Sequence, residues 1–194
     1  MMFRLQLPTD LRWVNVAKMS EEAILSDHAY CELKAAGTAI ALIHKFYDYP
    51  NIVSKMTELA REEMEHFNRV HEIILKRGYQ LGVVKKDEYV RQIATSVKSG
   101  GSRIQQLVDH LLVAALIEAR SCERFKLLSE QIKDTELAEF YRELMESEAG
   151  HYTMFITLAR EVSQRETVDK RWEEILSIEA EIIKTLGNSS SIHG

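Results

Sequence analysis

Residues 56–70, MTELAREEMEHFNRV, contain a charged pair where a helix should be apolar. Apolar residues recur there in steps of three and four, which places them on one face of a helix, and Glu63 and His66 fall on that same face. Burying a carboxylate and an imidazole is unfavourable unless another group satisfies them. A metal ion is the usual solution, because the i, i+3 spacing lets both side chains reach one ion.

The pattern returns at residues 141–155, YRELMESEAGHYTMF, where Glu148 and His151 form the second pair. Upstream of each pair one more carboxylate interrupts an apolar stripe, Glu32 in the first case and Glu118 in the second. Nearly equal numbers of residues separate Glu32 from Glu63 and Glu118 from Glu148. This repeat predicts that a helical hairpin occurs twice in the chain. Two hairpins joined by a long crossover are typical of the ferritin-like four-helix bundle.

The remaining sequence predicts an all-α fold. Among 194 residues there are only 8 Gly and 2 Pro, and most of them lie at expected helix boundaries. We expect a short helix at about 11–18, long helices at about 21–48, 50–77, 102–132 and 135–163, a short crossover helix at 86–97 and a C-terminal helix at about 166–186. The whole chain, 1–194, is expected to be one domain with its core bundle at about 20–163 and a disordered tail at 187–194.

Six inward-facing side chains form a candidate metal site: Glu32, Glu63, His66, Glu118, Glu148 and His151. The alternative is that these groups pair with one another in a metal-free core, but acids outnumber the inward-facing bases and buried ion pairs rarely repay their desolvation. Four carboxylates and two imidazoles suit two iron ions, with manganese as the other option. His28, one turn before Glu32, is either a support for this site or a hydrogen-bonded core histidine.

Composition excludes several classes of protein. The net charge of −5 gives no overall signature of nucleic-acid binding. The basic residues are nevertheless concentrated, because residues 76–103 hold seven Lys and Arg against two acidic residues. The two cysteines form no CxxC motif, which suits a reducing compartment. No signal peptide and no apolar run long enough for a membrane span is recognised, so a cytoplasmic protein is expected.

Four stretches of sequence indicate a particular family of ferritin-like proteins: HAYCELKAAG at 28–37, REEMEHF at 61–67, LIEARSCERF at 116–125 and ESEAGHY at 146–152. Together they resemble the MiaE family of bacterial tRNA hydroxylases, which are ferritin-like di-iron carboxylate proteins. The resemblance extends over nearly the whole chain, and the stretch at 116–125 is its most distinctive part. Every ligand position that the family requires is filled.

The resemblance implies an O2-dependent hydroxylation of the isopentenyl group of 2-methylthio-N6-isopentenyladenosine, next to the anticodon of tRNA. It implies that the six candidate ligands hold two iron ions, with Glu63 and Glu148 bridging. The chain has no flavin or nicotinamide motif, so a separate reductase is expected as electron donor. We expect a monomer or small oligomer without a membrane partner.

The basic segment is the natural element to face tRNA, since Lys and Arg contact phosphates. The candidate contacts are Lys85, Lys86, Arg91, Lys98 and Arg103. The alternative is a solvated loop with scattered charges.

Two other functions fit the ligand pattern. One is a small-molecule di-iron oxygenase such as a quinone hydroxylase, which would show an exposed apolar surface for membranes. The other is iron storage or detoxification, as in bacterioferritin, which would assemble into a large cage. A rubrerythrin-like peroxidase is disfavoured because the chain lacks the usual CxxC iron site.

Overall fold

The computed structural model describes residues 2–18, 20–84, 86–98, 100–186 and 192. Within these residues all regular structure is helical, which confirms the predicted all-α class. The α-helices are α1 (Arg12–Lys18), α2 (Glu21–Lys45), α3 (Pro50–Lys76), α4 (Glu88–Ile93), α5 (Arg103–Gln131), α6 (Thr135–Val162) and α7 (Arg165–Leu186). Short 3-10 turns span Met2–Arg4 and Ala94–Ser96.

The chain divides into two compact units. The hairpin unit comprises residues 17–86 and contains α2 and α3. The larger unit comprises residues 1–16 and 87–194 and contains α4 to α7. The single domain expected over 1–194 stays a prediction, and each unit is described here by itself.

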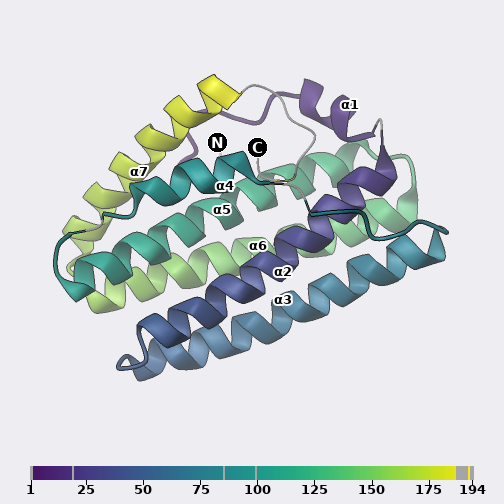
Figure 1. Ribbon diagram of the computed structural model, residues 1–194. Helices are drawn as coiled ribbons and strands as arrows, with labels where there is room; N and C mark the ends of the chain where they lie inside the picture. Colours follow the sequence, from purple (N-terminus) through teal and green to yellow (C-terminus); the bar gives the residue numbers. More distant parts are fainter. Residues whose placement is uncertain (1, 19, 85, 99, 187–191, 193–194) are drawn as a thin grey trace. The chain divides into compact units, whose positions relative to one another are not determined.

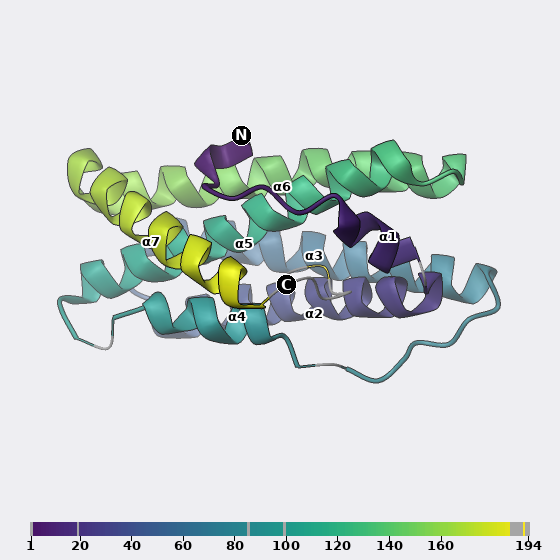
Figure 2. The ribbon, with the colours of Figure 1, turned by 90° about the horizontal axis from the view of Figure 1, so that it is seen from above.

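In the hairpin unit α2 and α3 lie side by side and run in opposite directions (Figures 1 and 2). Ser20 caps α2 by accepting a hydrogen bond from the Ala23 backbone N–H. α2 ends at Lys45, three residues before the predicted end, because Phe46 leaves the helical conformation and its ring is buried. Pro50 then opens α3, as predicted.

The chain leaving α3 returns along α2. Gly78 takes a positive φ of 73°, which ends the helix as its sequence position predicts. Gly82 then forms two hydrogen bonds with α2. Its N–H donates to Ser26 Oγ at 3.0 Å, and its carbonyl accepts from the Tyr30 hydroxyl at 2.9 Å. Arg77 adds an ion pair with Glu21 at 2.8 Å. These contacts fix the register of the hairpin.

In the larger unit α5 and α6 form a second antiparallel hairpin. Ser102 and Gln105 form a capping box at the start of α5, and Asp134 caps α6 through the Leu137 N–H at 3.0 Å. The boundaries of both helices agree with the sequence-based prediction to within a residue or two. The second hairpin therefore repeats the first, with longer helices on either side of its turn.

α5 is buried on most of its circumference, which the sequence analysis did not anticipate. The apolar stripe that Glu118 interrupts is buried as predicted at Leu107, Leu111, Ala114, Phe125 and Leu128, whereas Ile104 at its start is 42% exposed. The other face of α5 is covered because α7 packs against it, and α4 packs against α7 in turn. α4 is shorter than the predicted helix at 86–97, since Asp87 caps it and the chain continues as a 3-10 turn.

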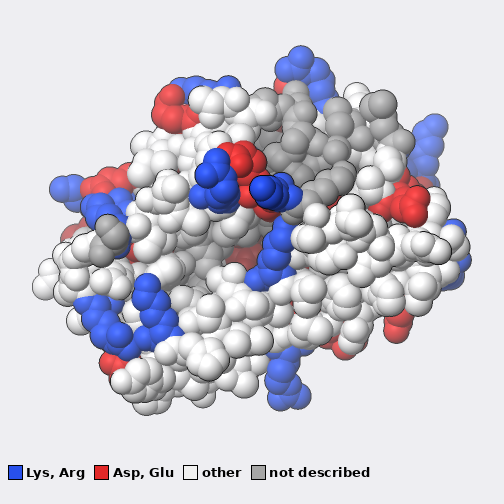
Figure 3. Space-filling model, in the orientation of Figure 1, with Lys and Arg blue, Asp and Glu red and all other residues white. Residues whose placement is uncertain are grey.

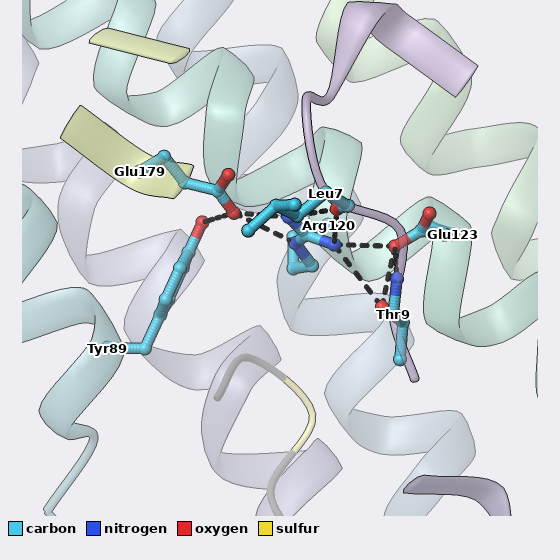
Figure 4. Close-up of polar contacts among 6 residues, drawn as sticks. All are labelled: Leu7, Thr9, Tyr89, Arg120, Glu123 and Glu179. Atoms are coloured by element: carbon cyan, nitrogen blue, oxygen red, sulfur yellow. Dashed lines mark hydrogen bonds and ion pairs between the residues drawn. The ribbon is translucent and has the colours of Figure 1, made fainter. Parts of the chain in front are cut away.

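A buried arginine joins four segments of the larger unit (Figure 4). Arg120 of α5 donates to Glu179 of α7 through Nε, at 3.1 Å, and through Nη2. It also donates to the Leu7 carbonyl at 3.2 Å and to Glu123 at 2.6 Å. Tyr89 of α4 completes the network by donating to Glu179 at 3.3 Å. Burial raises the pKa of Glu179, and the positive charge of Arg120 acts against this.

Of the predicted disordered tail, residues 187–191 and 193–194 lie outside the described residues. Ile192 is described, and it is fully buried. No helix in the described part of the chain combines the length and apolar character that crossing a membrane requires.

Candidate metal centre

The first ligand group consists of Glu32, Glu63 and His66, all within the hairpin unit and all buried. One potential ligand atom of each residue lies within 4.8 Å of those of the other two. His66 Nδ1 is 3.2 Å from Glu63 Oε2 and 3.7 Å from Glu32 Oε2. Nδ1 is therefore the ring nitrogen that faces the carboxylates, and it is the atom that would bind a metal.

His28 supports this group from one turn earlier on α2. Its Nε2 lies 2.6 Å from Glu32 Oε1, and the imidazole is fully buried. The contact fixes one oxygen of Glu32 while the other, Oε2, faces His66. Both interpretations of His28 from the sequence apply, because it is a core histidine and its hydrogen bond orients a candidate ligand.

The electrostatics of the first ligand group favour a bound cation. Burial lowers the pKa of His66, but hydrogen bonds and negative charge from Glu32 and Glu63 outweigh it and raise that pKa to about 10. The imidazole thus carries a proton at neutral pH when no metal is bound. A metal ion would replace that proton as the positive charge between the two carboxylates.

The second ligand group consists of Glu118, Glu148 and His151, all buried within the larger unit. Its potential ligand atoms also lie within 4.8 Å of one another. His151 Nδ1 is 3.4 Å from Glu148 Oε2, so the same ring nitrogen faces the carboxylate as in the first ligand group. The i, i+3 geometry on α3 is thus repeated on α6.

Each ligand group offers two carboxylates and one imidazole, a donor set that suits iron or manganese. Cys122 lies near the second ligand group but is a poor candidate for a further ligand. Its thiol donates to the Met145 carbonyl at 3.1 Å. Burial, together with the negative charges of Glu148 and Glu123, raises its pKa to about 12, so it stays protonated.

Comparison with known proteins identifies the family. The chain matches the family described as tRNA-(MS[2]IO[6]A)-hydroxylase (MiaE) over residues 2–194. This chain belongs to the MiaE family. A tRNA 2-(methylsulfanyl)-N(6)-isopentenyladenosine(37) hydroxylase of Pseudomonas putida is 36% identical over 186 residues, covering 96% of this chain and 89% of the relative. A protein of the same description from Salmonella typhimurium is 28% identical, over 92% of this chain and 83% of the relative.

A solved structure also resembles this MiaE-family chain. It is described as protein 43 with aldehyde deformylating oxygenase activity, from Synechococcus. The TM-score is 0.91 and the identity 34%, with 98% of this chain and 95% of the other covered. The ferritin-like fold class predicted from the sequence is thereby confirmed.

The basic residues singled out in this MiaE-family sequence differ in their surroundings. Arg91 is engaged by Glu88 on the same short helix. Lys98 lines a cavity of the larger unit, with its side chain 66% exposed. Lys86 and Arg103 are exposed, and Lys85 lies outside the described residues. On the face seen in Figure 3, Lys and Arg side chains occur in small groups, several of them beside Asp or Glu.

Several polar residues of the larger unit were not predicted from the sequence: the buried Tyr89, Asp109, Arg120 and Glu179, and the half-buried Arg171. Each belongs to a network that fixes α7 or the segment before α5. One feature of the sequence could have predicted this burial. The apolar run LLVAALIEA at 111–119 spans more than two helical turns, so this part of α5 has no polar face to turn toward solvent.

Proposed function

We propose that this chain hydroxylates the isopentenyl group of 2-methylthio-N6-isopentenyladenosine in tRNA, using O2. The observation that carries the proposal is the pair of ligand groups with identical composition, one in each repeated hairpin, in a chain that belongs to the MiaE family. The net reaction inserts one oxygen atom of O2 into a C–H bond and reduces the other to water. It consumes two protons and two electrons.

The two ligand groups would hold two iron ions, with Glu32, Glu63 and His66 as donors from one hairpin and Glu118, Glu148 and His151 as donors from the other. Six donors from four carboxylates and two imidazoles are what a di-iron carboxylate centre requires. Manganese is the alternative metal for the same donors. When bound, the metal pair supplies the capacity to bind and reduce O2, which no amino-acid side chain has.

The protein's own residues would position and protect this chemistry. His28 holds the carboxylate of Glu32, so that its second oxygen is directed toward His66. All six candidate ligands are buried, which would keep bulk water away from the reaction. The imidazoles of His66 and His151 would act as neutral ligands through Nδ1, releasing any proton when metal binds.

The electrons would come from a separate reductase, because no flavin or nicotinamide motif is recognised in the sequence. Transfer RNA would be the macromolecular partner, and the protein would act in the cytoplasm as a monomer or small oligomer. Neither the tRNA partner nor the separate reductase requires a membrane.

Nucleoside mass spectrometry tests the proposed function. The iron-loaded, chemically reduced protein would be incubated with O2 and tRNA that carries the prenylated, methylthiolated adenosine. We expect the mass of one oxygen atom to be added to that nucleoside. Glu148→Ala should abolish the gain, whereas Glu146→Ala, an exposed glutamate of the same helix, should retain it.

A second candidate function follows from the solved relative, whose description names aldehyde deformylating oxygenase activity. The same protein preparation would be incubated with a fatty aldehyde, and released formate would be measured. Formate production without any modification of tRNA would replace the hydroxylase proposal. A large cage in size-exclusion chromatography, with no oxygenation of either substrate, would favour iron storage instead.

A further inference from the structure

The larger unit contains a cavity of about 380 Å³ outside both ligand groups. It is formed by the segment before α5, the first turns of α5, the end of α6 and the first turns of α7. Its charged lining residues are Lys98, Asp109, Lys170, Arg171 and Glu174. None of the residues described as lining it is aromatic.

The floor of the cavity is an ion-pair network in which Arg171 lies between two carboxylates, those of Asp109 and Glu174. Arg171 donates through Nε to Asp109 Oδ1 at 2.7 Å and through Nη2 to Oδ2 at 3.1 Å. Its Nη1 donates to Glu174 at 2.9 Å. The backbone N–H of Lys98 donates to Asp109 Oδ2 at 2.9 Å, and the Ser96 carbonyl accepts from Arg171. The segment that carries Lys98 is therefore held against α5 and α7.

Two lysines, Lys98 and Lys170, also line the cavity, and their combined charge exceeds what the two carboxylates of the floor leave unbalanced. Lys170 is exposed, and within the described part of the chain it forms no ion pair. Lys98 Nζ is 3.8 Å from Glu174, a carboxylate that Arg171 already engages more closely. The lining thus carries three cationic side chains against two carboxylates, a surplus of one positive charge, and the two lysine side chains that supply it are exposed.

The backbone at Gly100 and Gly101, just before α5, is accessible to a ligand. Gly100 and Gly101 both line the cavity and carry no side chain. A Cβ atom at Gly100 would meet nothing within 4 Å, so the space beside the backbone is open. A tetrahedral anion can approach such a segment closely, as it can approach other glycine-rich turns.

We propose that this cavity binds a phosphate group of the tRNA backbone, contacted by Lys98 and Lys170. The inference rests on the proposed function, and it adds Lys170 to the residues suspected from the sequence. Recognition of an unstacked base uses aromatic platforms, and the described lining has none. Phosphate contacts through lysine fix position and orientation without reading sequence. The cavity is accordingly a positioning site for the RNA backbone.

The test compares two double variants with the same change in net charge. Lys98→Glu with Lys170→Glu removes both proposed contacts. The control, Lys126→Glu with Lys184→Glu, reverses two exposed lysines on α5 and α7 that do not line the cavity. Affinity for a modified anticodon stem-loop would be measured by fluorescence anisotropy over a series of salt concentrations.

We expect the cavity variant to bind RNA at least about tenfold more weakly than the control, because Lys–phosphate contacts supply salt-dependent affinity. Neutral Lys98→Gln and Lys170→Gln should each lower the slope of log affinity against log salt by about one. Thr167→Trp fills the cavity without changing charge, and it should also weaken binding. Equal losses in the cavity and control variants would overturn the proposal.

The outcomes separate this inference from the proposed function. If the wild-type protein neither binds nor hydroxylates the modified RNA, the proposed function fails. If it does both and the cavity variants match the control, the cavity assignment alone fails. A further experiment measures how inorganic phosphate competes with RNA for the wild-type protein and the cavity variants. Cavity variants that lose sensitivity to phosphate but keep full RNA affinity would show a small-anion site instead, which would also overturn the assignment.

Discussion

At the scale of single residues, the candidate metal ligands could be picked out from the sequence because each breaks an apolar stripe. Glu63 and Glu148 are charges at positions where leucine would be expected, and nothing but a partner can make such burial tolerable. His28 was harder to interpret, since a lone buried histidine has several explanations. Only the 2.6 Å contact with Glu32 Oε1 identifies the group that it orients.

Removing the hydrogen bond from His28 should weaken metal binding without unfolding the protein. His28→Phe keeps an aromatic ring in the core but leaves Glu32 Oε1 without its donor. Loss of a residue that orients a metal ligand typically costs 10- to 100-fold in affinity, and we expect a loss of about that size. Competitive titration with Mn²⁺ or Fe²⁺ would measure it.

The control for this prediction is His44→Phe, an exposed histidine near the end of the same helix. His28→Gln, which restores an N–H donor, should recover part of the lost affinity. Metal binding by His28→Phe within twofold of the wild type would show that the contact has no orienting role.

At the scale of helices, boundaries were predictable wherever a cap or breaker residue fixes them. Ser102, Asp134 and Pro50 each begin a helix as expected, because their side chains satisfy or avoid free N–H groups. The end of α2 was predicted three residues late, because burial of Phe46 is a tertiary effect that the local sequence does not show.

Gly101→Ala should destabilise the start of α5, whereas Gly100→Ala should be nearly neutral. Gly101 has a positive φ of 99°, and a Cβ atom there would lie 2.6 Å from Gln105 Oε1. That oxygen accepts the Ser102 N–H at 2.7 Å, so the substitution strains the backbone and breaks the capping box. We expect a loss of about 2 kcal/mol in the free energy of unfolding, from urea denaturation. Equal stabilities for the two variants would contradict this account.

At the scale of the whole molecule, the all-α class and the repeated hairpins followed from the sequence, but the burial around α5 did not. Arg120 and Asp109 look like surface residues in a helical periodicity, since charged residues rarely lie fully inside. They are buried because α7, far along the chain, packs over them. Contacts between distant segments of this kind leave little trace in a local pattern.

Glu179→Gln should destabilise the larger unit strongly, because it removes one of the two carboxylates that pair with buried Arg120 and leaves Glu123 to neutralise it. The side chains of Arg120 and Glu179 are fully buried, and loss of one member of such a pair typically costs about 3–5 kcal/mol. Glu181→Gln, on the same helix and exposed, is the control and should cost less than about 1 kcal/mol. Thermal and urea unfolding of both variants would show the difference, and similar midpoints would refute it.

The Arg120 network also constrains the order in which the chain can fold during synthesis. Leu7 and Thr9 are synthesised more than 100 residues before their partner Arg120 on α5. Arg120 in turn needs Glu179, which follows it by 59 residues. Domains generally fold as units while the chain emerges, so the hairpin unit can form early. The segment that carries Leu7 and Thr9, by contrast, cannot complete its buried network until α7, with Glu179, has been translated.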